Sequence, residues 1–189
     1  YLCGKDEQSG RSFEHRRGWI RERLEELAGI LPLEVLTFSV MENHLHVLFR
    51  NRPDIRDEWS DEEIVRRWRR LFPKYQKGQL VELTKEELKA LVADKKWVQE
   101  RRRRLGHVSW LMRCITEKIA RQANAEDKVT GRFWQGRFSC QRILDEAALL
   151  ACSMYVDLNP IRAGLAKTPE TSWFTSACER IQARKLAQE

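Results

Sequence analysis

Two short alternating segments joined by a polar turn constrain the fold of this chain more than any other feature. Residues 35–40 and 44–49 both carry apolar side chains at every second position, which is the period of a β-strand. Glu42 and Asn43 lie between them and supply the polar residues of a tight turn. We therefore predict an antiparallel β-hairpin, which must bury one apolar face against helices.

The second strand of this hairpin carries two of the four histidines, His44 and His46, with Leu45 between them. Side chains alternate across a strand, so both imidazoles should emerge on one face, roughly 7 Å apart at the backbone. Two neutral imidazoles on one face can share a divalent cation, although such a pair can also simply hydrogen bond. His15 and His107 have no partner at ligand spacing, and we expect them to be ordinary surface or core residues.

Length and composition predict one domain of 189 residues with an elaborated insertion. A hydrophobic fraction of 42%, with seven Trp and seven Phe, is enough for a core and argues against disorder. The 35 Lys and Arg exceed the 28 Asp and Glu, which gives a net charge of +7. This excess suits a phosphate-bearing partner, while the many acids also fit a surface of ion pairs.

The same composition bears on location. No apolar run approaches the ~20 residues of a membrane span, and no secretory signal is visible, so we expect no membrane partner. The five widely spaced cysteines lack a Cys-x-x-Cys pair and suggest reduced thiols in a cytoplasmic protein.

The expected fold class is α+β, a ferredoxin-like or palm-like antiparallel sheet flanked by helices. A helix is predicted over 12–28, capped by Ser12 and stopped by Gly29, before the hairpin. Such a sheet needs another strand before this helix, and the chain begins too late to supply it in full. We therefore expect that first strand to be missing or truncated.

Residues 52–106 have a different character and are predicted to be a helical insertion. Two capping boxes, Ser60-x-x-Glu63 and Thr84-x-x-Glu87, mark helix starts. Four consecutive arginines at 101–104 close the segment. Such a run is usually a solvated face, but beside a metal site it can grip a nucleic-acid backbone.

The segment 131–138 alternates arginines with aromatic residues, a pattern suited to phosphates and to stacking on unpaired bases. A strand or turn with apolar anchors would show the same pattern of residues. After this segment we expect a short strand that ends at Ile143. The candidate nucleic-acid contacts are Arg101, Arg102, Arg103, Arg104, Arg132, Trp134, Arg137 and Phe138.

A helix capped by Asp145 should run to about Leu158, and a closing helix should span 173–184. On the first of these, Tyr155 and Asn159 lie four residues apart and so share a helix face. The ordinary alternative is a core tyrosine with a satisfied hydroxyl. Pro160 also biases Asn159 away from helical dihedrals, which leaves its direction open.

Together these motifs resemble the HUH single-tyrosine transposases, in particular the REP-associated tyrosine transposases of bacteria. The resemblance covers roughly residues 13–50 and 109–177 and does not extend to the insertion. Its most specific block begins at Tyr155. The matching residues are Met41-Glu42-Asn43-His44-Leu45-His46, then Gly131-Arg132-Phe133-Trp134-Gln135-Gly136-Arg137-Phe138, Asp145-Glu146, and Tyr155-Val156-Asp157-Leu158-Asn159-Pro160-Ile161-Arg162-Ala163-Gly164-Leu165.

The resemblance implies a role for each matched position. His44, His46 and Asn159 would ligate Mg²⁺ or Mn²⁺, and Tyr155 would be the nucleophile that forms a 5′-phosphotyrosine. The implied activity is nicking and strand transfer of single-stranded DNA at hairpin elements, in the bacterial cytoplasm and at the nucleoid when DNA is bound. Whether the protein forms a homodimer is left open by the sequence. A missing first strand would depart from the family, whose central sheet includes it.

Two other readings of the residues stay open. A catalytically inactive, domesticated regulator would keep the basic surface and bind nucleic acid without needing Tyr155. A zinc phosphoesterase would use the histidine pair with acids such as Asp157, although the sequence offers no convincing further cluster of ligands.

Overall fold

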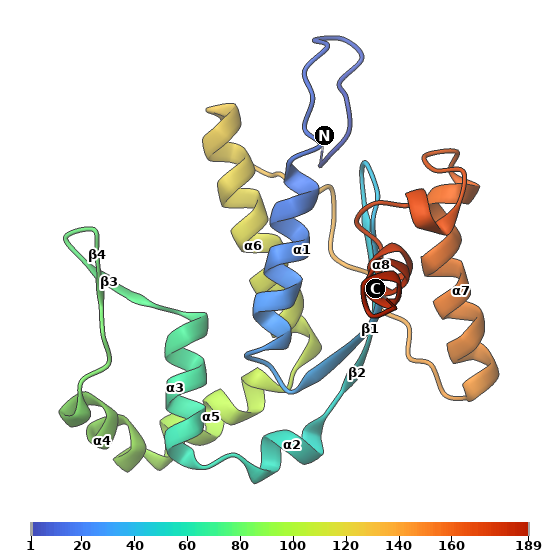
Figure 1. The fold of residues 1–189 in the computed structure, drawn as a ribbon. Coiled ribbons are helices and arrows are strands. Elements are labelled where there is room, and N and C mark those ends of the chain that lie inside the picture. The colour runs from blue at the N-terminus through green and yellow to red at the C-terminus, as the bar shows by residue number, and fades with distance from the viewer. Residues whose placement is uncertain (1, 189) are drawn as a thin grey trace.

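The computed structural model describes residues 2–188, and it confirms the α+β class (Figure 1). Within these residues the chain forms eight α-helices, one short 3₁₀ helix and two two-stranded antiparallel sheets. In chain order the elements are α1 (Arg16–Ala28), β1 (Leu33–Val40), β2 (Leu45–Asn51), α2 (Pro53–Glu58), α3 (Asp61–Leu71), β3 (Lys74–Gln76), β4 (Gln79–Val81), α4 (Lys85–Ala93), α5 (Lys95–Leu105), α6 (Val108–Asp127), α7 (Glu146–Arg162), η1 (Pro169–Thr171) and α8 (Ser176–Leu186).

The predicted hairpin is present as β1 and β2, which pair antiparallel with Val40 opposite Leu45 and Ser39 opposite His46. The edge of β1 that faces away from β2 forms one isolated β-bridge, between Ser39 and Thr175, the residue before α8. Within residues 2–188 the central sheet therefore has two full strands. The residues before α1 form a loop closed by an isolated bridge rather than a strand of this sheet.

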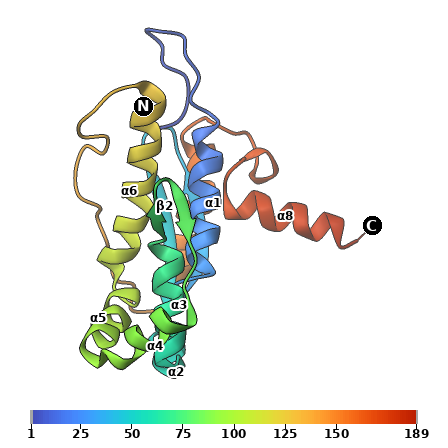
Figure 2. The same cartoon turned by 90° about the vertical axis from the view of Figure 1, so that its left-hand side faces the viewer.

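Helices cover both faces of the hairpin (Figure 1). On one face α1 packs against β1, and α6 lies beside α1. On the other face α7 contacts both strands. Helix α8 begins at the outer edge of β1, pairs through Glu179 with Arg21 of α1, and then extends away from the body (Figure 2). No helix in the described part of the chain is long and apolar enough to cross a membrane.

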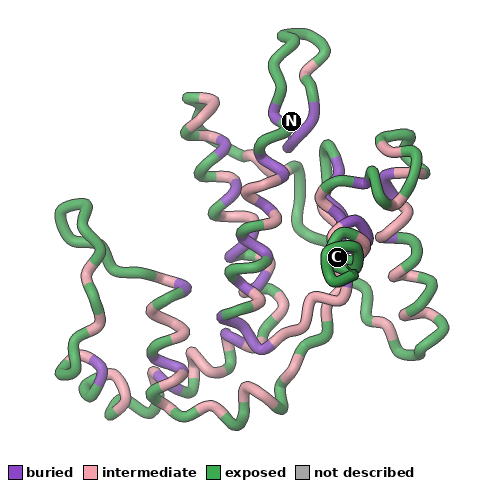
Figure 3. The backbone as a smooth tube through the Cα atoms, viewed as in Figure 1, coloured by how far each residue is buried: buried purple, intermediate pink, exposed green. Residues whose placement is uncertain are grey.

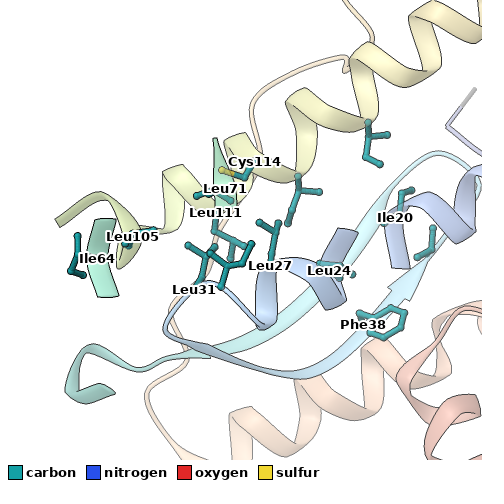
Figure 4. Packing of buried hydrophobic residues seen from close by; sticks show 14 of the residues in the cluster. Ile20, Leu24, Leu27, Leu31, Phe38, Ile64, Leu71, Leu105, Leu111 and Cys114 are labelled. Atoms are coloured by element: carbon teal, nitrogen blue, oxygen red, sulfur yellow. The ribbon is translucent and has the colours of Figure 1, made fainter. Parts of the chain in front are cut away.

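The hydrophobic core lies between α1, α6 and the hairpin and continues into the insertion (Figures 3 and 4). Ile20 and Leu27 of α1 and Ile115 of α6 are almost fully buried. Burying side chains of this size contributes roughly 1.5–3 kcal/mol each. One core therefore joins the insertion to the main body, as a single domain requires.

Buried arginines add polar ties to this core. The side chain of Arg16 has no exposed surface, and its guanidinium pairs with Glu126 at 2.7 Å and Asp127 at 2.6 Å at the end of α6. Arg17 donates to the carbonyl oxygen of Val40, the last residue of β1. Helix α1 is thereby fixed to both α6 and the hairpin.

Three predicted helix starts agree with the structure. The side chains of Ser60, Thr84 and Asp145 each accept a hydrogen bond from the backbone N–H three residues later. The predicted start of the first helix at Ser12 is wrong, because α1 begins at Arg16. Phe13 is buried and its N–H donates to the carbonyl of Gly4, which holds these residues in a turn.

Two other details differ from the prediction. The insertion is not purely helical, because Lys77 and Gly78, both with positive φ, form the turn of the small β3–β4 hairpin. The short strand expected up to Ile143 is absent, and residues 128–144 run without regular structure. The indole of Trp134 donates to the carbonyl of Thr116, which ties this segment to α6 and not to a sheet edge.

Candidate functional site

The two histidines lie where the turn of the hairpin passes into β2, and their rings meet on one face. The Nε2 atoms of His44 and His46 are 3.1 Å apart, and the ring planes are nearly perpendicular. Nδ1 of His44 lies 2.6 Å from Oδ1 of Asn43. With Nδ1 of His44 donating to this amide oxygen, Nε2 presents a lone pair, which either accepts a hydrogen bond from Nε2 of His46 or binds a cation.

This spacing suits a shared cation. Two ligand atoms each about 2.1 Å from Mg²⁺ and at right angles to one another lie about 3.0 Å apart. Partial burial lowers the pKa of His46, and the neighbouring His44 lowers it further. A lowered pKa favours the neutral imidazole, which is the form that binds a metal.

Helix α7 brings Tyr155 to the same place from more than one hundred residues away in the sequence. Its ring centre is 5.5 Å from that of His46, in an edge-to-face arrangement. The Tyr155 side chain is 46% exposed, so it is not the satisfied core tyrosine that the sequence left open. A half-exposed phenol beside two imidazoles is accessible to a large substrate.

Asn159 follows one turn later on α7 and is only 9% exposed. Its Nδ2 atom is buried and has no hydrogen-bond partner. The nitrogen and oxygen of such an amide are interchangeable in the assignment, and an orphaned buried amide needs an explanation. An amide oxygen bound to a hard cation would supply one, so the chemistry of Asn159, like that of His44 and His46, suits Mg²⁺ or Mn²⁺.

Asp157, the acid considered for a zinc site, is engaged elsewhere. Its carboxylate accepts a hydrogen bond from the hydroxyl of Thr37 on β1. The same carboxylate forms an ion pair at 2.6 Å with Arg180 on α8. Among the described residues no cluster of three or more His, Cys, Asp and Glu side chains is placed to hold a metal. Asp157 therefore joins α7 to the sheet two residues after Tyr155.

Arg162 is a candidate that the sequence reasoning did not single out. Its guanidinium carbon lies 5.1 Å from the centre of the Tyr155 ring. Within residues 2–188 no acidic side chain pairs with it. The seven-residue spacing between Tyr155 and Arg162 spans two helical turns and places both on one face, which is the signal that could have identified it.

The predicted DNA contacts divide into two groups. Trp134 is half-buried and anchored to α6, and three of the four clustered arginines are held by acids: Arg102 by Asp61, and Arg103 and Arg104 by Glu100. The remaining arginines are not ion-paired in the described part of the chain. These are Arg101, Arg137 and Arg132, and the guanidinium of Arg132 donates only to the carbonyl of Gln135. Phe138 is exposed on the same segment.

Comparisons of this chain with protein-family models, with curated proteins and with solved structures gave no match. The interpretation of the site therefore rests on the chemistry and geometry of its own residues.

The Asp157 contacts predict that this carboxylate positions α7. Asp157→Ala should lower the free energy of unfolding by about 1–3 kcal/mol, because it leaves the buried hydroxyl of Thr37 without an acceptor and removes the ion pair of Arg180. It should also weaken the nuclear Overhauser effects between the rings of His46 and Tyr155. Asp57→Ala is the matched control, since Asp57 is exposed and pairs only with its neighbour Arg56. Unchanged ring contacts in Asp157→Ala would contradict this role.

Proposed function

We propose that this chain is a metal-dependent single-stranded DNA endonuclease and strand transferase of the HUH single-tyrosine transposase type. The observation that carries the proposal is the packing of Tyr155 against His46, whose Nε2 faces that of His44 at 3.1 Å. A nucleophile and a pair of cation ligands from distant segments thus share one exposed face. This is the arrangement that phosphoryl transfer to a side chain requires.

His44, His46 and Asn159 are the residues that would hold Mg²⁺ or Mn²⁺. A bound ion would supply Lewis-acid polarisation of the scissile phosphate and charge stabilisation in the transition state. The two histidines would hold it on the side of the hairpin where Tyr155 lies. The lowered pKa of His46 keeps its ring available as a ligand at neutral pH.

The chemistry at Tyr155 balances without an external energy source. The phenolic oxygen attacks phosphorus, the bond from phosphorus to the 3′ oxygen breaks, and the products are a 5′-phosphotyrosine and a free 3′-OH. The phenol proton leaves to solvent, to which this residue is open, and the departing 3′ oxygen takes a proton from solvent. A 3′-OH of another strand reverses the step and joins the ends.

Arg162 supports this step electrostatically. A guanidinium beside the ring stabilises negative charge that develops on the phenolic oxygen and attracts the phosphate. We expect the same cation to contact the DNA backbone next to the cleaved bond. We place the activity on single-stranded DNA with hairpin elements, in the bacterial cytoplasm and at the nucleoid.

The first prediction concerns the nucleophile. Wild-type protein incubated with labelled hairpin-bearing single-stranded DNA and Mn²⁺ should give a covalent protein–DNA adduct that survives denaturing electrophoresis. Tyr155→Phe should abolish the adduct, whereas Tyr75→Phe, at another exposed tyrosine, should not. Binding without an adduct would instead favour a catalytically inactive regulator. Multiple turnover that persists in Tyr155→Phe would indicate hydrolysis.

The second prediction separates the metal from the DNA surface. His46→Ala should abolish cleavage while most of the DNA affinity remains, because phosphate contacts elsewhere supply that affinity. Chelation of divalent ions should have the same effect on the wild type. His107→Ala is the control, since His107 lies outside the site. A parallel loss of affinity and cleavage in His46→Ala would count against a metal role.

The third prediction tests Arg162. Arg162→Gln should slow adduct formation by about 10- to 100-fold, as expected for loss of one stabilising charge at the reacting phosphate. Arg162→Lys should recover part of the rate, because the charge returns without the planar group. Arg66→Gln, which removes an exposed guanidinium on α3, is the control. Equal rates for Arg162→Gln and the wild type would remove Arg162 from the mechanism.

A further inference from the structure

A ladder of tryptophans and arginines is formed by side chains of α3, α5 and the start of α6. The guanidinium carbon of Arg101 lies 4.4 Å from the Trp97 ring centre and 5.3 Å from that of Trp68. The guanidinium of Arg104 lies 6.0 Å from Trp68 and 4.6 Å from Trp110. All five side chains are partly exposed, so the ladder is a surface and not an interior feature.

Arg101 is the arginine of the ladder that contacts tryptophan rings but has no hydrogen-bond or ion-pair partner within residues 2–188. Among the described residues no carboxylate or carbonyl accepts from its guanidinium, and its Nε atom is buried without a hydrogen bond. Burial lowers the pKa of Arg101, and the charge on Arg104 adds to this. A partly desolvated, unpaired cation is unfavourable by itself and is relieved by an incoming anion.

The acids around the ladder are too few to neutralise it. Each of two carboxylates serves two guanidinium groups, so the cluster keeps an excess of positive charge together with Arg101. The shared pairs are Glu100 with Arg103 and Arg104, and Glu117 with Arg113 and Arg121. Arg113 also lies 5.1 Å from the centre of the Trp110 ring, which extends the ladder along α6.

The surface leads toward the helix that bears Tyr155. Thr116, one turn after Arg113 on α6, accepts the hydrogen bond from Trp134, and this anchors the segment 131–138 beside the ladder. Arg132 and Arg137 are exposed on that segment, which continues into α7. Between the histidines and the insertion, β2 runs five residues from His46 to Asn51, about 17 Å at the rise of a strand.

We propose that this ladder on α3, α5 and α6 is a second contact surface for single-stranded DNA, which holds the strand outside the cleavage site without reading its sequence. The inference rests on the proposed function. Flat rings and stacked guanidinium groups offer π-faces to any base, and the excess cations meet the phosphates, which together define a sequence-tolerant single-strand surface. It also gives the insertion a role in substrate binding.

The test measures the affinity of the full chain for fluorescent oligonucleotides that carry the hairpin and thymidine tails of increasing length, on either end. Wild-type affinity should rise with tail length. The double variant Arg101→Gln/Arg113→Gln should lose about 10-fold for the longest tail and little for the tailless hairpin. The slope of the logarithm of its affinity against the logarithm of the salt concentration should become shallower by about 0.7 per lost phosphate contact. Arg66→Gln, which removes one charge as the single variant Arg113→Gln does, should behave as the wild type.

Further outcomes decide between the alternatives. Equal losses for tailed and tailless DNA, or no loss at all, would overturn the proposal and leave the ladder a purely structural stack. The single variant Arg113→Gln, at a side chain 58% exposed, guards against a folding defect at Arg101. Tyr155→Phe keeps the tail-dependent affinity if the ladder binds DNA, so failure of adduct formation alone would refute the proposed chemistry and not this surface.

Discussion

The candidate site depends on one carboxylate. Asp157 joins β1, α7 and α8 through Thr37 and Arg180, residues that lie more than one hundred positions apart in the sequence. Helix α7 contacts both strands but buries few side chains, namely Val156, Asn159 and Pro160. A helix with few buried side chains gains less from packing, so a polar tie contributes more to its position. The contacts of Asp157 therefore help to set where Tyr155 lies relative to the histidines.

The other side of the site is rigid for a different reason. Val40, at the end of β1, accepts a hydrogen bond from Arg17, and Arg16 fixes the same helix to α6 through buried ion pairs. Removing one member of such a pair leaves an uncompensated buried charge, which strongly disfavours alternative arrangements. The histidine strand thus belongs to a well-packed body, and the nucleophile belongs to a helix held mainly at one face.

The sequence predicted the parts of the site that follow from local periodicity. The two-residue period placed His44 and His46 on one face, and the four-residue spacing placed Tyr155 and Asn159 on one helix. It could not predict that α7 would meet the β2 face, because that contact depends on Asp157 and Thr37, which no spacing relates. Likewise the strand expected up to Ile143 failed because Trp134 found a partner on α6, a tertiary contact that overrides local strand propensity.

The four-arginine run shows why composition alone overstates a binding surface. Counted from the sequence, the four side chains are equivalent, yet Asp61 and Glu100 engage three of them and leave Arg101 without an acid. An arginine already paired with a carboxylate must exchange that partner to bind phosphate, so it adds less affinity than an unpaired one. Within residues 2–188, charge that no carboxylate pairs with lies at Arg162 beside Tyr155, at Arg101 among the tryptophans, and at Arg132 and Arg137 on the segment between α6 and α7. We therefore expect these arginines, and not the whole four-arginine run, to contact DNA phosphates.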